Sequence, residues 1–206
     1  MGNPIPRRDP DPLPLYCGYF AAQVTPHEVG SHPTEVLVPH QRDALASAFA
    51  PLVSCDAGML HPSWVGQRLH WVYGGLGERG VFFRVHSCGQ LEYLGTSEHP
   101  SSDFVEFEEA SSAERPVSPG YVAYEKKEEE EGSEDSEFSD APAVHVGGAA
   151  ALDPDDRPAC LRCSQPMHYI GAVESDCFSD DFSVDALVHL FYCADCKLQC
   201  CLDQPK

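Results

Sequence analysis

The chain has 206 residues, a length that fits one large or two small domains with a buried core. Its 33 acidic residues outnumber its 13 basic residues, which gives a formal net charge of −20. Nucleic-acid phosphates and anionic lipids repel such a chain, so the composition argues against both as partners. A protein with a basic surface is instead attracted, and we expect the partner to be of this kind.

The hydropathy pattern indicates a cytoplasmic protein. No run of 18 apolar residues occurs, so we expect no membrane-spanning helix. The first fifteen residues are polar and rich in proline, and they lack the apolar centre of a signal peptide. In a reducing compartment, paired cysteines bind metal more often than each other, which bears on the ten cysteines of this chain.

The first predicted elements lie in the N-terminal half. Five prolines within residues 1–15 predict a disordered arm. Branched residues predict a strand over 34–38, and apolar residues at helical spacing predict a helix over 41–52. Alternating residues predict strands over 68–73 and 81–85, which a glycine-rich turn would join as a hairpin.

Further short strands are predicted over 91–94, around 104–107 and over 121–124. Many short strands with one or two helices indicate an α+β domain over residues 16–124, dominated by an antiparallel sheet. Residues 125–140 then contain nine acidic residues, and because like charges repel, they predict a disordered linker. An acidic decoy for the groove of a basic partner is the functional alternative for this linker.

Residues 141–206 are predicted to form a zinc-knuckle β module, which either shares a sheet with residues 16–124 or forms a domain of its own. Its strands are expected over 144–148, 167–173 and 186–192, with an acidic loop over 174–185. A Cys-x-x-Cys pair stands before the second strand and another follows the third, which is the order of a zinc ribbon. This module contains ten acidic and four basic residues, so it lacks the positive charge that a nucleic-acid-binding ribbon needs.

The two cysteine pairs are the strongest chemical signal in the chain. Thiolates at positions i and i+3 of a tight turn present both sulfur atoms to one point, and two such knuckles can supply a tetrahedral Zn²⁺ site. The predicted ligands are Cys160, Cys163, Cys193 and Cys196. Alternative ligands nearby are Cys200, Cys201, Cys177 and His189. Two disulfides, or four unrelated buried thiols, remain the alternatives to a metal site.

A site of four thiolates leaves no open coordination position, so its zinc would be structural. No common catalytic motif occurs, and we predict no catalytic residues. The alternative is a thiol-dependent enzyme or redox sensor that uses an exposed cysteine, with Cys88 beside His86 or the pair Cys200 and Cys201 as candidates. Such a thiol requires a low pKa and access to solvent.

The C-terminal stretch resembles a known family. Val146-Gly147-Gly148, the segment from Pro158 to Ile170 with its first knuckle, and Leu190-Phe191-Tyr192 before the second knuckle are similar to bacterial YwqG-like proteins of unknown function. Ser164 stands where those proteins have a glycine. The stretch more distantly resembles the programmed cell death protein 2 group, whose members act as binding chaperones.

The resemblance implies a β-rich fold and a non-catalytic role, and some relatives of this kind are thought to be immunity proteins of bacterial toxin systems. Together with the charge, it leads to the expectation of a zinc-stabilised protein that binds another protein. An immunity or antitoxin-like inhibitor and a chaperone-like adaptor both fit that expectation.

Overall fold

A mainly antiparallel β-sheet dominates the computed structural model. The structure describes residues 13–21, 28–29, 33–46, 48–74, 80–97, 120–126, 144–150, 152–153, 156–174 and 186–205. The strands in these ranges are β1 (Leu13–Ala21), β2 (Glu28–Val29), β3 (Ala50–Asp56), β4 (Arg68–Tyr73), β5 (Val81–Val85), β6 (Leu91–Thr96), β7 (Gly120–Lys126), β8 (Val144–Gly148), β9 (His168–Glu174), β10 (Ala186–Cys193) and β11 (Leu198–Pro205). This confirms the predicted fold class.

All eleven strands belong to one sheet, in the order β4-β3-β2-β7-β1-β8-β9-β10-β11-β5-β6. The four strands β8 to β11 come from residues 141–206, and they lie between strands of the N-terminal half. β1 joins the two parts on one side, because it pairs with both β7 and β8. On the other side, β11 pairs with β5. The two predicted regions therefore share one sheet.

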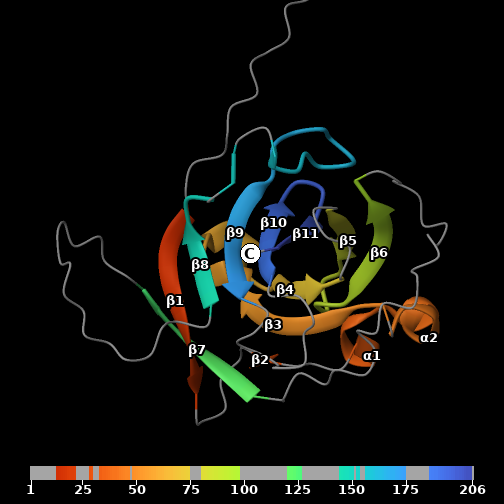
Figure 1. The fold of residues 1–206 in the computed structure, drawn as a ribbon, viewed down its shortest axis with the longest axis horizontal. Helices are drawn as coiled ribbons and strands as arrows, with labels where there is room; N and C mark the ends of the chain where they lie inside the picture. Colours follow the sequence, from red (N-terminus) through yellow and green to blue (C-terminus); the bar gives the residue numbers. More distant parts are fainter. Residues whose placement is uncertain are drawn as a thin grey trace, which may run out of the picture.

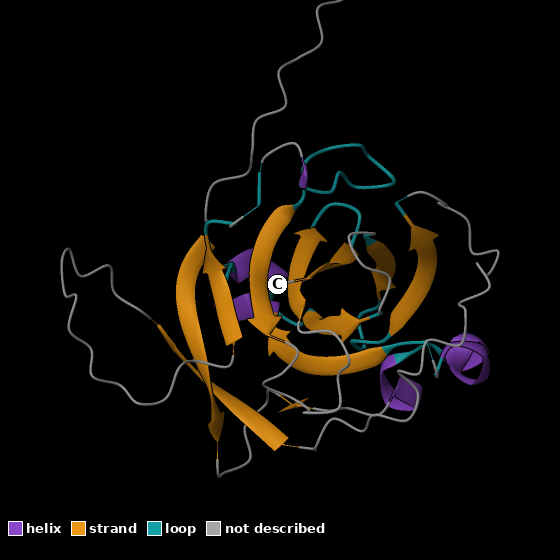
Figure 2. Cartoon of the chain, in the orientation of Figure 1, coloured by secondary structure: helices purple, strands orange, loops and turns teal. Residues whose placement is uncertain are grey.

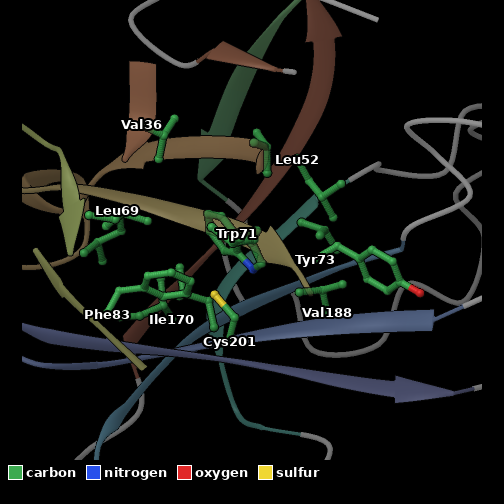
Figure 3. Close-up of a cluster of buried hydrophobic side chains, with 14 of the residues drawn as sticks. Val36, Leu52, Leu69, Trp71, Tyr73, Phe83, Ile170, Val188 and Cys201 are labelled. Carbon is green, nitrogen blue, oxygen red and sulfur yellow. The ribbon is translucent and has the colours of Figure 1, made fainter. Parts of the chain in front are cut away.

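The sheet curls on itself, so that β4 lies across β10 and β11 (Figure 1). Trp71 of β4 is fully buried at this crossing, and its indole Nε1 donates a hydrogen bond of 3.4 Å to the carbonyl of Gly171. Figure 3 shows Trp71 above Cys201 and Val188, with Leu69 and Tyr73 on the same strand. The edge strand β4 is therefore part of the core.

Strands β10 and β11 are buried on both faces. Leu190 and Tyr192 point into the large cluster around Trp71. Phe191 and Cys200 point to the opposite face, where they pack in a second, smaller cluster. That second cluster has members from β5, β10, β11 and the segment that precedes β9: Phe82, Leu152, Cys160, Met167, Phe191, Cys193, Leu198, Cys200 and Leu202.

Two glutamine side chains bind the outermost strands of the sheet. The Gln199 amide donates to the His70 carbonyl of β4 (2.8 Å) and accepts from the His70 N–H (3.3 Å). The Gln41 amide does the same for Tyr93 of β6, donating at 3.1 Å and accepting at 2.8 Å. Each amide thus pairs both backbone groups of one edge residue, as the peptide of a neighbouring strand would.

Two local predictions are wrong. Residues 34–38 were expected to be a strand, but the chain forms helix α1 (Pro33–Val36), and the proline at its first position has the φ that a helix needs. Residues 41–52 were expected to be one helix. Instead, the 3₁₀ turn η1 (Pro39–Gln41) and helix α2 (Arg42–Leu45) end early, and β3 follows. These short helices lie beside the curled sheet (Figure 2).

The predicted hairpin between residues 68–73 and 81–85 is also wrong, although both strands are present. β4 pairs with β3, whereas β5 pairs with β6 and β11. The turns η2 (Ala57–Met59) and η3 (Pro62–Trp64) lie between β3 and β4 and make that pairing local. The real hairpin partner of β5 is β6, across the turn at Cys88 and Gly89.

The other strand predictions are confirmed where the structure describes them. β6, β7, β8 and β10 contain the predicted segments 91–94, 121–124, 144–148 and 186–192, and β9 begins one residue after the start of the predicted segment 167–173. Strands β1, β2, β3 and β11 were not predicted, and β1 begins at Leu13, within the expected N-terminal arm. Residues 1–12, the candidate strand at 104–107 and residues 127–140 of the expected linker lie outside the described residues.

Candidate metal centre

Four cysteine sulfur atoms converge at one end of the β9–β10–β11 part of the sheet. The Sγ atoms of Cys160, Cys163, Cys193 and Cys196 all lie within 4.8 Å of one another. The Cys163 and Cys193 sulfurs, from different knuckles, are 3.7 Å apart. A tetrahedral site with Zn–S bonds of about 2.3 Å places its sulfurs about 3.8 Å apart. All four cysteines are free thiols, so the spacing fits a shared metal ion and not a pair of disulfides.

The first knuckle lies in the connection between β8 and β9. The Cys160 N–H donates to the Gln165 carbonyl (2.9 Å), and the Ser164 N–H donates to the Cys160 carbonyl (2.8 Å). An isolated bridge between Ala159 and Pro166 closes the base of this loop. Ser164 has a φ of 58°, in the left-handed region. The knuckle is therefore a tight loop closed by its own backbone.

The second knuckle is the turn of the β10–β11 hairpin. Cys193 and Leu198 are the last paired residues of the two strands, and residues 194–197 form the turn between them. The Lys197 carbonyl accepts a hydrogen bond of 2.8 Å from the Val85 N–H of β5. Lys197 has a φ of 54°, so both knuckles have a left-handed residue directly after their second cysteine.

Burial differs within each knuckle. Cys160 and Cys193, the first cysteines, are 1% and 6% exposed, whereas Cys163 and Cys196 are half-buried. The Gln165 backbone N–H lowers the pKa of the Cys163 thiol, because it stabilises the thiolate. Burial raises the pKa of Cys193, and burial together with the neighbouring cysteines raises that of Cys196 to about 11. Without a metal ion, the raised pKa values keep Cys193 and Cys196 protonated, and a bound cation would be needed to offset the charge of four thiolates.

Among the described residues, the alternative ligands do not reach this cluster. Cys200 and Cys201 are fully buried in β11, where desolvation raises both pKa values, that of Cys201 to about 12. His189 is also buried, and its Nε2 lies 2.9 Å from the Gln204 Oε1. Cys177 lies outside the described residues. Among the described residues, the group that could hold a metal ion thus consists of the four cysteines of the two knuckles.

The thiol candidates for an enzyme are not arranged for catalysis. High pKa values and burial make Cys200 and Cys201 the opposite of a reactive thiolate. Cys88 is exposed, but its sulfur donates to the Gln90 Oε1 at 3.5 Å. The neighbouring His86 instead contacts the Glu92 carboxylate at 3.2 Å. The structure therefore does not pair Cys88 with its candidate base.

Sequence reasoning missed the residues that shape the knuckles. Gln165 supplies an N–H to the Cys163 sulfur, and Ser164 and Lys197 take the left-handed conformation. The sequence signal for the left-handed conformation was position, since Ser164 and Lys197 each directly follow a Cys-x-x-Cys pair. At Ser164 the resemblance pointed to a glycine position, whereas at Lys197 no glycine, the residue that normally marks such a backbone position, revealed the conformation.

No helix within the described ranges is long and apolar enough to cross a membrane. Comparisons with protein-family models, curated proteins and solved structures find no match for this chain. The class of this protein is therefore described by its fold and its site alone. It is an antiparallel β protein with a four-cysteine cluster that is compatible with a zinc-binding module.

Proposed function

We propose that the four cysteines bind one structural Zn²⁺ ion. The observation that carries this proposal is the convergence of four Sγ atoms within 4.8 Å, from two knuckles of the same shape. Tetrahedral sites of four sulfurs are typical of zinc and iron, and zinc is the usual ion of a closed structural site. With four protein ligands, no coordination position is left for substrate or water, so the ion would stabilise the fold and perform no chemistry.

The zinc would tie the first knuckle to the sheet. Leu152 and Met167 flank this knuckle in sequence, and they pack with Phe191 and Cys200 on the outer face of β10 and β11. Because the first knuckle belongs to a loop and the second to the hairpin, a shared ion fixes the loop over that apolar face. The free energy of metal binding would then contribute directly to folding.

The test is elemental analysis of full-length protein, purified under reducing conditions without added metal. We expect one zinc ion per chain. A protein that is folded and free of metal would overturn the proposal, and so would a stoichiometric content of iron in place of zinc.

For the whole molecule, we propose a non-catalytic role in the cytoplasm as a protein that binds another protein with a basic surface. The supporting observation is the charge and its distribution. The described residues contain eleven acidic and seven basic side chains, a net −4 of the total −20, so the rest of the chain carries −16. Complementary charge accelerates the association of proteins and selects partners. The resemblance to YwqG-like proteins and to the programmed cell death protein 2 group favours an immunity-like inhibitor or a chaperone-like adaptor.

This role is tested by affinity capture from cell extract at low and high ionic strength, with identification of the retained proteins by mass spectrometry. We expect a stoichiometric basic partner whose association rate falls as salt screens the charges. A variant with the glutamates of residues 128–131 changed to glutamine is the matched control, because it removes four charges outside the described sheet. A partner that binds equally well at both salt concentrations would contradict the electrostatic part of the proposal.

A further inference from the structure

The four sulfurs of the metal centre differ in their access to solvent. Cys160 and Cys193 are 1% and 6% exposed, whereas Cys163 and Cys196 are half-buried. A cysteine thiolate remains a nucleophile, and oxidants select thiolates that they can reach. An oxidant that approaches the centre therefore meets the second cysteine of a knuckle before the first.

Cys163 also faces a sulfur of the other knuckle. Its Sγ lies 3.7 Å from the Sγ of Cys193, and the two residues come from the β8–β9 connection and from the end of β10. A disulfide bond needs a separation of about 2.05 Å, which is reached by a short local movement of the loop that carries Cys163. Cys193 is held in place as the last paired residue of its strand.

Building on the zinc centre proposed above, we propose that this centre is a redox switch: a hydroperoxide oxidises Cys163, and a Cys163–Cys193 disulfide then replaces the metal as the link between the knuckles. The chemistry follows from the accessible sulfur and its neighbour at 3.7 Å. Two of the four ligands are lost in this reaction, so the site no longer retains its ion.

The reaction balances in two steps. The Cys163 sulfur attacks the peroxide, an S–O bond forms as the O–O bond breaks, and the departing oxygen takes a proton and leaves as water or alcohol. The Cys193 sulfur then attacks the Cys163 sulfur, an S–S bond forms as the S–O bond breaks, and the hydroxide leaves as water after it takes a proton. Two electrons pass from the sulfurs to the peroxide, and a thiol reductant returns them.

The position of this disulfide has a structural consequence. A bond between the knuckles keeps the first knuckle, with Leu152 and Met167, packed against Phe191. Disulfides within each knuckle would instead leave the loop without a covalent or metal link to the hairpin. The oxidised, metal-free protein is therefore expected to stay folded and to recover its ion after reduction.

The experiment treats the zinc-loaded full chain with hydrogen peroxide while a chromogenic chelator reports released zinc. We expect release of the bound ion together with the loss of two of the ten thiols, and a Cys163–Cys193 cross-linked peptide in the mass spectrum of a digest. Reduction with dithiothreitol followed by addition of zinc should restore the two thiols and the bound ion. A disulfide within either knuckle, or an ion that is retained while other thiols oxidise, would overturn the switch.

Two matched variants make the test specific. Cys163→His and Cys196→His each leave three cysteines and one histidine, a ligand set that still binds zinc. Release by peroxide should be about tenfold or more slower in Cys163→His, which lacks the attacked sulfur, than in Cys196→His, which keeps it. Cys88→Ser, which removes an exposed thiol outside the centre, should release zinc as the wild type does.

Equal rates in the two histidine variants would contradict the assignment to Cys163. The structural zinc ion is tested by a different outcome. Its proposal is excluded if the untreated wild-type protein contains no metal. A wild-type protein that contains zinc and keeps it under peroxide excludes only the switch.

Discussion

Each knuckle has a Cys-x-x-Cys pair followed by a left-handed residue, but the rest of the chain holds the two knuckles differently. The second knuckle is the turn between two strands that pair over their full length, and β5 supports it through the Lys197 carbonyl. The first knuckle is part of a connection closed by one isolated bridge between Ala159 and Pro166. The second half of the site is therefore preformed by the sheet, whereas the first half would depend on the proposed zinc ion for its position.

The largest effect is expected from loss of a ligand on the preformed side. Cys193→Ser removes a buried sulfur, and three thiolates hold zinc less well than four. We expect loss of the metal and a decrease in the free energy of unfolding of more than about 4 kcal/mol, since loss of a structural metal belongs to the most destabilising changes. Elemental analysis measures the loss of metal, and chemical denaturation measures the free energy of unfolding. Cys88→Ser serves as the control, and an unchanged melting temperature in Cys193→Ser would refute a stabilising metal.

Removal of the metal by a chelator should affect the two knuckles differently. Without the ion, the backbone of residues 156–167 should lose its protection against hydrogen exchange, while the amides of β10 and β11 should keep most of theirs. The reason is that the sheet holds the second knuckle through hydrogen bonds that do not involve the metal. Equal loss of protection in both segments would show that the hairpin is not preformed.

The stability of the sheet should depend on pH through His70 of β4. His70 is buried beside Gln199, its Nε2 donates to the Gly89 carbonyl at 3.0 Å, and burial together with the charge of Arg68 lowers its pKa to about 4. The unfolded chain binds a proton near a pH of about 6.5, so folding stability is full above this pH and falls as the pH drops towards 4. One pKa unit corresponds to about 1.36 kcal/mol, so we expect a loss of about 3 kcal/mol.

Urea denaturation of the chelator-treated protein over this pH range measures the loss, because the metal ligands then make no contribution. His70→Asn, which keeps a donor for the Gly89 carbonyl and does not titrate, is the control. A wild-type profile as flat as that of the variant would exclude His70 as the origin.

The smallest effect concerns the left-handed residues. Ser164→Gly and Lys197→Gly should each stabilise the protein by about 0.5–1 kcal/mol, because glycine adopts a positive φ without steric cost. Ser164→Ala keeps the strain and should give no gain. Thermal unfolding measures the changes. A destabilised Ser164→Gly variant would indicate that the Ser164 side chain has a structural role of its own.

Local patterns predicted the elements far better than their partners. Alternation identified 68–73 and 81–85 as strands, but the partner of Val81–Val85 on one side is Leu198–Pro205, more than a hundred residues away, and no local pattern reveals such a pairing. The four-cysteine cluster was predictable because each knuckle is a local motif, and only the meeting of the two knuckles depends on the fold.

The missed strand β3 has a different cause. Its residues follow an apolar spacing typical of a helix, and Pro51 suggested the end of that helix. In the structure, the pairing of β3 with β4 shifts register between Pro51 and Val53. A proline, which cannot donate a backbone hydrogen bond, is tolerated at such an irregularity. Tertiary pairing thus overrides the local preference at this position.

The amides of Gln41 and Gln199 have a consequence for association between chains. A sheet whose outer strands expose free N–H and C=O groups is a template for strands of other molecules, and such growth leads to aggregates. Tyr93 and His70, one on each outermost strand, already have both backbone groups paired by a side chain of the same molecule. At these two positions of the described sheet, a side chain takes the place of a backbone neighbour, so neither residue offers a free backbone group to an added strand.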